Sequence, residues 1–274
     1  MSTSAMVVFP NCKINLGLHI THKRADGFHD LETVFYPVAL TDALEVLTAG
    51  ELQFTGSGIS IPGDSGENLC VRAFQLLQQD FPALQPVQIH LHKHIPIGAG
   101  LGGGSADGAF MLQLLNNKYQ LGLSEAQLIA YAAQLGSDCP FFISNKPCFA
   151  TGRGEMLEPI ALDLSAYSML LVYPGIHVNT GWAFRQLTPA VPLYSLKEMI
   201  QLPVSEWRGV ITNDFELPVF SEYPVLAEIK EEMYRQGAVY AAMSGSGSAI
   251  VGLFPKASLP DVEWDSSYKV FKIR

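Results

Sequence analysis

A run of glycines between Gly98 and Gly104 constrains the local fold of this chain more than any other feature. Five of these seven residues are glycine, and Ser105 and an apolar-periodic segment follow at once. Without Cβ atoms, such a loop can bend into conformations closed to other residues and bring bare backbone N–H groups close to a ligand. The start of the next helix adds unpaired donors and a partial positive charge. The segment therefore predicts a cradle for polyphosphate and, with it, an enzyme that uses ATP.

Two other glycine motifs fit less well. A Walker loop needs Lys and then Ser or Thr after its last glycine, whereas Ser105 and Ala106 follow Gly104. Residues 98–103 satisfy G-x-G-x-x-G and follow a strand-like run at 87–95, but a dinucleotide fold needs another strand about 20 residues later. Residues 121–135 have a helical pattern instead. A flexible linker is less favoured, because Leu101 interrupts the glycines and a helix follows at once.

Composition narrows the class of protein. The 274 residues are 48% hydrophobic, which suits an ordinary globular protein of one large or two medium domains. The net charge of −9 argues against nucleic acid as a partner, and local positive groups must attract any anionic substrate. No apolar run reaches membrane-spanning length and no signal peptide is evident, so we expect a cytoplasmic protein. The four cysteines lack metal-ligand spacing, and we expect buried thiols.

Hydrophobic periodicity predicts the elements of the first half of the chain. Alternation and turn signals favour strands across 6–54 and at 87–95. Helices are expected at 68–81, from about Ser105 to Tyr119 with Ser105 as N-cap, and from Ser124 to Gly136. The segment Ser124-Glu-Ala-Gln127 is a capping box.

The pattern changes near residue 165. Strands are expected at 169–173, 239–243, 249–254 and 268–273, helices at 195–201 and 224–236, and a Gly/Ser loop at 244–248. We predict two α+β halves, residues 1–160 and 161–274.

Three ordered motifs resemble the GHMP kinase superfamily, which is named for galactokinase, homoserine, mevalonate and phosphomevalonate kinases. They are the opening Pro10–Leu18, the glycine segment Pro96–Ala106 and the late segment Met243–Ala249. Within the superfamily, the opening 13–34 and the segments 136–142, 152–155 and 213–216 resemble the 4-diphosphocytidyl-2-C-methyl-D-erythritol kinases of the non-mevalonate isoprenoid pathway. The resemblance implies an N-terminal α+β domain like that of a ribosomal protein, a C-terminal ferredoxin-like domain, and an active site between them.

The resemblance also implies the residues that carry phosphoryl transfer. Asp138 would be the base that takes the proton of the acceptor hydroxyl, although an Asp in this turn could instead cap the next segment. Lys13 interrupts an apolar strand, where an exposed position is the alternative; the resemblance places its cation beside Asp138, keeping the carboxylate ionised and stabilising the transferring phosphoryl group. The family pattern assigns ATP to the glycine segment and to two residues bordering the adenine; the set is Pro96, Ile97, Gly98, Ala99, Gly100, Leu101, Gly102, Gly103, Gly104, Ser105, Ala106, Asn68 and Leu69.

The acceptor, a cytidine diphosphate of methylerythritol, would bind by its cytosine. The family pattern implies that Phe28 and Phe184 sandwich the base and that His29 reads its polar edge, whereas single phenylalanines are more often core residues. Asn15 would position the erythritol end, and the remaining substrate-binding candidates are Thr180, Gly245 and Ser246. ATP requires Mg²⁺, for which Ser105 and Asp138 are candidate ligands beside water. A monomer or homodimer is expected.

Two residues depart from the family pattern. Phe28 stands where Tyr is common, which removes a hydroxyl donor, and Asp107-Gly108 stands where Asn-Ala is frequent. His90, His92 and His94 alternate along one strand face; we favour a solvated face over a metal site.

Two rival functions stay open. One is another enzyme on this scaffold, a homoserine or mevalonate kinase or a diphosphate decarboxylase, but the loop Gly27-Phe-His29 favours a cytosine reader. The other is a non-catalytic ligand sensor, which the presence of the lysine, the aspartate and the glycines disfavours.

Overall fold

The computed structural model of this chain describes residues 5–261 and 263–274. These residues form two compact units that interleave along the sequence. The first unit holds the chain up to Cys12, Ala39–Ile97 and Gly102–Lys146, and the second holds Lys13–Val38, Gly98–Leu101 and Pro147–Arg274. The glycine segment thus passes from one unit to the other and back. The domain boundary near residue 160 stays a prediction.

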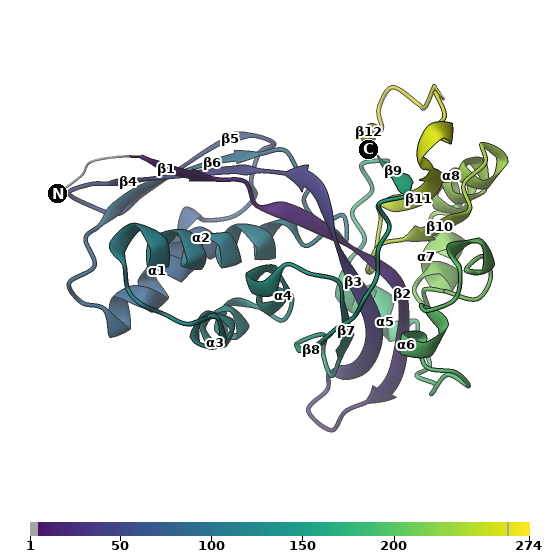
Figure 1. The fold of residues 1–274 in the computed structure, drawn as a ribbon, viewed down its shortest axis with the longest axis horizontal. Helices are drawn as coiled ribbons and strands as arrows, with labels where there is room; N and C mark the ends of the chain where they lie inside the picture. Colours follow the sequence, from purple (N-terminus) through teal and green to yellow (C-terminus); the bar gives the residue numbers. More distant parts are fainter. Residues whose placement is uncertain (1–4, 262) are drawn as a thin grey trace. The chain divides into compact units, whose positions relative to one another are not determined.

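The first unit packs helices on one face of a four-stranded sheet (Figure 1). The strands are ordered β1 (Met6–Val8), β4 (Ala43–Thr48), β6 (Val87–Lys93) and β5 (Gln53–Gly58), with only the β5–β6 pair parallel. Helices α1 (Leu69–Asp80) and α2 (Gly103–Tyr119) lie beneath the sheet, and α3 (Glu125–Leu135) and α4 (Cys139–Ser144) follow. The alternation of β6 buries Val87, Ile89 and Leu91 while His90 and His92 face outward, as predicted.

Helix starts in the first unit follow local chemistry. Asn68 caps α1 by accepting from the amide of Cys70, and Ser124 and Gln127 form the predicted capping box of α3. The expected start of α2 at Ser105 is wrong: the helix begins at Gly103, after Gly102 in the left-handed region at φ 68°. Because Gly102 supplies the sharp turn, Gly103 and Gly104 enter the helix and no side-chain cap is needed.

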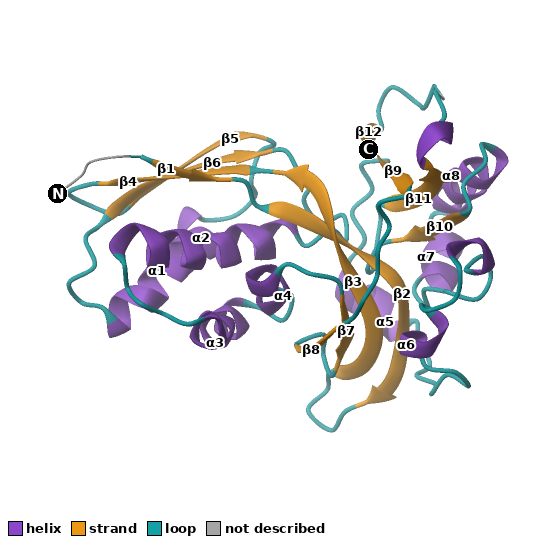
Figure 2. Cartoon of the chain, viewed as in Figure 1, coloured by secondary structure: helices purple, strands orange, loops and turns teal. Residues whose placement is uncertain are grey.

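The described residues of the second unit form two β-sheets and the helices α5 to α8 (Figure 2). Most of β2 (Asn11–Lys23) and β3 (His29–Thr41) form a sheet in the order β2-β3-β7-β8 with β7 (Cys148–Thr151) and β8 (Met156–Pro159). The other sheet has the order β10-β11-β9-β12, made of Tyr240–Met243, Ile250–Pro255, Tyr167–Tyr173 and Lys269–Ile273. The helices are α5 (Thr180–Arg185), α6 (Leu196–Met199), α7 (Glu216–Glu222) and α8 (Pro224–Arg235). The strand and helix expectations beyond residue 165 are therefore confirmed to within a few residues, and three short 3₁₀ turns occur at 65–67, 204–206 and 256–258.

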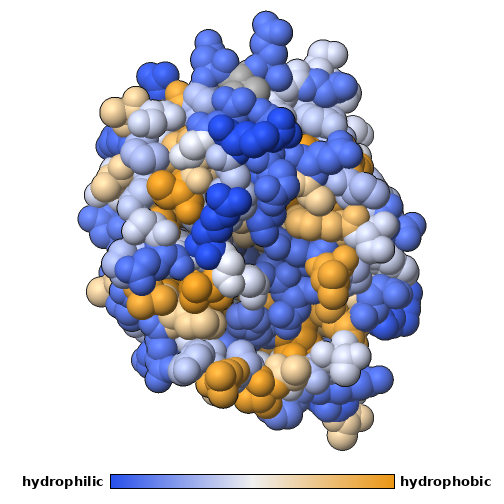
Figure 3. All heavy atoms as spheres, turned by 90° about the vertical axis from the view of Figure 1, so that its right-hand side faces the viewer, coloured by the Kyte–Doolittle hydropathy of each residue, from blue (hydrophilic) through white to orange (hydrophobic). Residues whose placement is uncertain are grey.

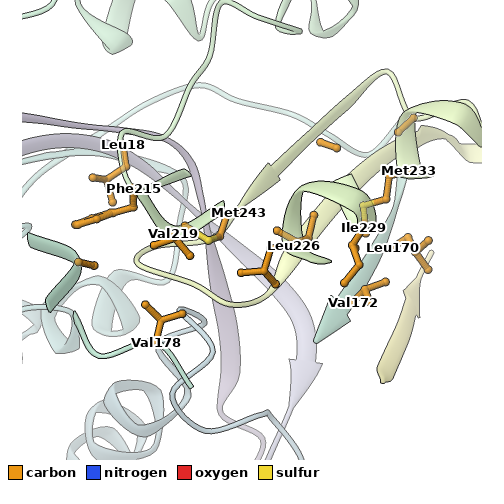
Figure 4. Close-up of a cluster of buried hydrophobic side chains, with 14 of the residues drawn as sticks. Leu18, Leu170, Val172, Val178, Phe215, Val219, Leu226, Ile229, Met233 and Met243 are labelled. Atoms are coloured by element: carbon orange, nitrogen blue, oxygen red, sulfur yellow. The ribbon is translucent and has the colours of Figure 1, made fainter. Parts of the chain in front are cut away.

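A hydrophobic cluster joins the second sheet to α5, α7 and α8 (Figure 4). It includes Leu170 and Val172 of β9, Val219 of α7 and Met233 of α8. Ala183 of α5 is fully buried in the same cluster. This core fixes α5, although that helix has only six residues, and so positions the side chains on its outer face.

The surface and the cysteines match the composition. All four cysteines are free and buried, as expected. Hydrophobic residues show between hydrophilic ones on the face seen in Figure 3. Leu193 and Leu217 are among the exposed hydrophobic side chains of the second unit. In the described part of the chain, no helix combines the length and the apolar character needed to cross a bilayer.

Candidate active site

The second-unit part of the glycine segment packs against the late Gly/Ser loop. Gly100 has φ 79°, and a Cβ there would overlap the carbonyl oxygen of Ser244. The amide of Ala249 donates to the carbonyl of Ala99 over 3.1 Å. A Cβ on Gly245 would lie 3.3 Å from Gly100. Gly100 is therefore a glycine for two reasons, its backbone conformation and the close approach of the loop at 244–248.

Lys13 is buried in this region, with 4% of its surface exposed. Its Nζ atom donates to Oδ1 of Asn15 over 2.6 Å and to the carbonyl of Gly100 over 3.3 Å, and lies 4.8 Å from the ring centroid of Phe35. A buried ammonium group needs such partners, because desolvation penalises an unpaired charge. The exposed-strand alternative for Lys13 is excluded by this burial.

Asn15 is held from both ends of its amide. Its Nδ2 atom donates to Thr33 over 2.9 Å, which in turn donates to the carbonyl of Gly17 over 2.6 Å. Its backbone amide donates to Oγ of Ser244 over 3.1 Å, and that hydroxyl donates to the carbonyl of Gly100 over 2.9 Å. These bonds orient Asn15 toward Lys13, so Asn15 fixes the position of the ammonium group whatever else it binds.

A cavity of about 460 Å³ opens in the first unit. Helix α2 contributes Gly104 and Asp107 to its lining, and the start of α1 contributes Asn68 and Leu69. Most of the remaining wall comes from the end of β5 and the connection that leads to α1, residues 56–65. The structure thus brings together three predicted nucleotide residues, Asn68, Leu69 and Gly104, from two helix starts. A helix N-terminus at the wall offers backbone donors to phosphate.

A buried ion group lies behind this cavity. Lys93 pairs with Asp42 and, over 2.7 Å, with Asp107, and all three side chains are almost fully buried. Asp42 also accepts from the amides of His94 and Ile95, over 2.6 and 2.8 Å, whereas Oδ1 of Asp107 has no partner. Burial raises the pKa of Asp107 to about 8, with the attraction of Lys93 only partly opposing it. Asp107 therefore holds its proton at pH values below about 8.

The buried ion group and the packing of α1 on α2 explain the Asp107-Gly108 departure. Asp107 serves Lys93 from the first turn of α2. A Cβ on Gly108 would lie 2.9 Å from Cβ of Leu69. Gly108 therefore permits the close contact of α1 with α2, which offsets its low helix propensity.

Asp138 precedes α4 and is partly exposed. It occupies the N-cap position, yet its carboxylate makes no capping hydrogen bond. Cys139 directly follows Asp138 in the chain, and its thiol forms a hydrogen bond with Ser105. The two predicted magnesium ligands, Ser105 and Asp138, therefore lie near each other in the first unit. Burial raises the pKa of Cys139 to about 11, which keeps this thiol neutral. Lys13 belongs to the second unit, and its pairing with Asp138 stays a prediction.

Helix α5 gathers the predicted acceptor residues of the second unit. Thr180 and Phe184 are four residues apart and share one helix face. The hydroxyl of Thr180 lies 3.0 Å from that of Ser246 in the late loop. The ring of Phe184 stacks on His29, with centroids 5.0 Å apart and planes 18° apart, and meets Phe215 edge-on. One turn of α5 therefore contacts both the late loop at 244–248 and His29 at the start of β3.

The structure pairs the rings differently from the predicted sandwich. The ring of His29 stacks on Phe184. The guanidinium of Arg153 lies over Phe28, 4.0 Å from the centroid of the Phe28 ring. A cytosine between Phe28 and Phe184 stays a prediction. The sequence reasoning did not assign a role to Arg153, whose only signal was its place in the Gly152–Glu155 motif. It also missed Asn213, whose Nδ2 donates to the carbonyls of Met243 and Gly245, both over 2.8 Å.

The described residues hold no group of three or more His, Cys, Asp or Glu side chains arranged for a metal ion. His90 and His92 both lie 3.0 Å from the hydroxyl of Ser57 on the outer face of the sheet. This contact is in line with the favoured solvated face.

Comparison with known families agrees with the fold. The model of the GHMP kinases N terminal domain matches residues 68–146, and that of the GHMP kinases C terminal matches residues 196–263. A mevalonate kinase from Methanococcus jannaschii has a similar fold, with a TM-score of 0.69, 14% identity and coverage of 100% of this chain and 99% of that one. These matches define the class as the GHMP kinases.

More similar relatives narrow the class. The chain is 55% identical over 274 residues to a 4-diphosphocytidyl-2-C-methyl-D-erythritol kinase from Bacteroides thetaiotaomicron, covering 98% of this chain and 100% of the relative. A crystal structure of a 4-(cytidine 5'-diphospho)-2C-methyl-D-erythritol kinase aligns with a TM-score of 0.75 and 35% identity over 90% of each chain. This chain belongs to that kinase family.

Proposed function

We propose that this protein transfers the γ-phosphoryl group of ATP to the 2-hydroxyl of 4-diphosphocytidyl-2-C-methyl-D-erythritol. The 55% identity over nearly the full length to a relative of that name carries the proposal. The buried network of Lys13, Asn15 and Gly100 and the first-unit cavity supply a rationale for it.

The residues of the first unit fit a nucleotide. A cavity bordered by Asn68 and Leu69 suits a flat base, and the backbone donors at the start of α2 near Gly104 suit phosphate oxygens. Bound there, ATP supplies the phosphoryl group, and the chain holds and orients it. Mg²⁺ would be held mainly by phosphate oxygens and water, with Ser105 and Asp138 as candidate protein ligands.

Asp138 and Lys13 have the chemistry for the transfer itself. Asp138 would accept the proton of the acceptor hydroxyl as its oxygen bonds to phosphorus and the bond to the leaving ADP breaks. Lys13 would stabilise the charge that develops on the phosphoryl oxygens. Because Asn15 fixes the ammonium group, this charge is oriented before substrate binds.

Acceptor recognition would use the second unit around α5. Aromatic faces at Phe28 and Phe184 favour a flat base, and a ring nitrogen of His29 can bond the polar edge of cytosine. The hydroxyls of Thr180 and Ser246 and the backbone of Gly245 would contact the rest of the acceptor. A homoserine or mevalonate acceptor would leave these rings unused.

An assay of ADP release with a panel of acceptors tests the proposal. The panel is 4-diphosphocytidyl-2-C-methyl-D-erythritol, homoserine, mevalonate and galactose. We expect turnover with the cytidine compound alone. Preference for an acceptor without cytosine would overturn the assignment and leave the kinase class intact, whereas ligand binding without any turnover would favour a sensor.

A further inference from the structure

Arg153 makes an unusual contact at the edge of the proposed acceptor region. It lies in the turn between β7 and β8, and its guanidinium stacks on Phe28, whose side chain is 50% exposed. A contact of this kind stabilises an exposed site by only about 0.5–1 kcal/mol. Stability alone therefore gives little reason for an arginine on this ring.

The backbone holds Arg153 and Phe28 in register. Strands β3 and β7 pair antiparallel, and just beyond that pairing the amide of Leu31 donates to the carbonyl of Gly152 over 2.8 Å. The amide of Arg153 donates to the carboxylate of Glu155 over 2.6 Å, which closes the turn. Hydrogen bonds of the backbone in both loops therefore fix the position of the stack, which does not depend on the conformation of one flexible side chain alone.

The charge of Arg153 acts on Asp26, whose pKa is lowered first by the hydrogen bond from the amide of Phe28 and also by the attraction of Arg24 and Arg153. Arg24, in the same loop as Phe28, is paired with Asp26 and Asp30 at 3.0 and 2.9 Å. Asp26 also accepts from the amide of Phe28 over 3.1 Å. Among the described residues, the ion pairs within 4 Å do not include Arg153. In a chain of net charge −9, such a cation is a local attraction for an anion.

We propose that Arg153 determines specificity for the diphosphate of the acceptor. This inference rests on the proposed function, which brings a cytidine diphosphate group to the loop of Phe28. The guanidinium lies 4.0 Å from the ring centroid of Phe28, which is half exposed, and its planar set of donors suits phosphate oxygens. Phe28 lacks the hydroxyl common in the resembling family, so Arg153 supplies the hydrogen-bond donors at this ring.

Two ligands separate the proposed role from a structural one. Cytidine carries the base without phosphate, and cytidine diphosphate carries both. Their binding to the full-length chain is measured by isothermal titration for the wild type, Arg153→Gln and Arg153→Lys. We expect Arg153→Gln to weaken cytidine diphosphate about 10–100-fold, the range for a charge-assisted hydrogen bond, and to change cytidine less than twofold. Arg153→Lys keeps the charge and should restore part of the loss.

Arg208 provides the matched control. Its guanidinium lies 4.0 Å from the ring centroid of Tyr234, the same type of contact elsewhere in the second unit. Arg208→Gln removes the same charge and should leave both ligands unchanged. In steady-state assays, Arg153→Gln should raise the acceptor KM without changing kcat or the KM for ATP.

Two outcomes would overturn the role of Arg153. Equal weakening of cytidine and cytidine diphosphate would mean that Arg153 only positions Phe28, and no change in either would mean that it has no part in binding. Failure of the proposed function has a different signature. Wild-type protein would then not phosphorylate the acceptor, while the two titrations would still report on Arg153.

Discussion

The cavity of the first unit and the ring group around α5 in the second unit differ in whether backbone or side chains provide the groups for binding. The cavity wall includes backbone at two helix starts, backed by the buried side chains of Asp42, Lys93 and Asp107. The ring group consists of side chains on a short helix and an exposed loop, Phe28, His29 and Phe184 among them. Backbone donors serve any polyphosphate, whereas rings and a cation select a particular base and its charge. Variants that separate transfer, nucleotide binding and acceptor binding therefore test whether this division is real.

Loss of the proposed base should have the largest effect, because it removes chemistry from both substrates alike. We expect Asp138→Asn to lower kcat about 10²–10⁴-fold, the usual contribution of acid–base catalysis, with little change in either KM. Asparagine has nearly the same shape as aspartate, and the carboxylate of Asp138 does not cap α4. The Tm of the variant should therefore stay close to that of the wild type. ADP release at saturating substrates measures kcat. Turnover near that of the wild type would remove the role of Asp138.

Two glycines of one segment should fail in opposite ways. Gly100→Ala places a Cβ against Ser244 at a positive φ, and we expect a loss of about 1–3 kcal/mol in the free energy of unfolding. Gly104 is helical, with nothing within 4 Å of a built Cβ, and it lines the cavity. Gly104→Ala should therefore keep or raise Tm by its better helix propensity, yet raise the KM for ATP several-fold. Denaturant unfolding and steady-state kinetics on both variants measure these effects.

An unchanged KM for ATP in Gly104→Ala would contradict the phosphate cradle, since that glycine would then face no ligand. A stable Gly100→Ala variant would contradict the packing of the late loop on the glycine segment. Either result would weaken the contrast between backbone-built and side-chain-built recognition.

The ring on α5 should affect the acceptor alone. We expect Phe184→Leu to raise the acceptor KM about 5–100-fold, because base–aromatic stacking contributes about 1–3 kcal/mol, and to leave the KM for ATP unchanged. Phe220 packs against the same hydrophobic cluster, so Phe220→Leu controls for general loss of packing. Equal changes in both variants would assign Phe184 to the core rather than to the base.

Local chemistry made much of this fold predictable. Capping at Asn68 and Ser124, alternation along β6 and the glycine run each carry their own signal over a few residues. The start of α2 was missed because Gly102 turns the chain through its backbone, without the side-chain cap that a sequence can display. The interleaving of the two units was also out of reach, since it depends on contacts between distant segments.

The roles of the candidate site residues stay predictions, and the contacts that these residues make could not be predicted from the sequence. Family motifs supplied Lys13, Asp138 and Phe184. Asn15 lies two residues from Lys13 on the same strand, whereas Gly100 comes to Lys13 from 87 residues away, a contact that the sequence does not reveal. Arg153 was missed for a similar reason: an arginine in a turn carries no pattern, and only strand pairing places it on Phe28. The contacts that could not be predicted depend on how distant segments of the chain pair, and the types of the residues do not reveal that pairing.

The pH dependence of stability tests the buried group of Asp42, Lys93 and Asp107 behind the cavity. Burial raises the pKa of Asp107 from 3.8 in its unperturbed state to about 8. Between about pH 4 and 8 the folded protein therefore retains a proton that the unfolded chain releases, so this group makes stability fall as pH rises through that window. The Asp107→Asn variant cannot ionise at this position, so its stability should fall less as pH rises. At pH 9 its Tm should therefore exceed that of the wild type, by about 2–4 °C for each 1 kcal/mol of stability that the wild type loses. At pH 5 the difference from this cause should be smaller than at pH 9, because the window that opens near pH 4 has then only begun to lower the stability of the wild type. Thermal unfolding from pH 5 to 9 measures the difference. Parallel Tm profiles for the two proteins would mean that Lys93 keeps Asp107 ionised, and the cavity would then be backed by a net negative charge that repels nucleotide phosphate.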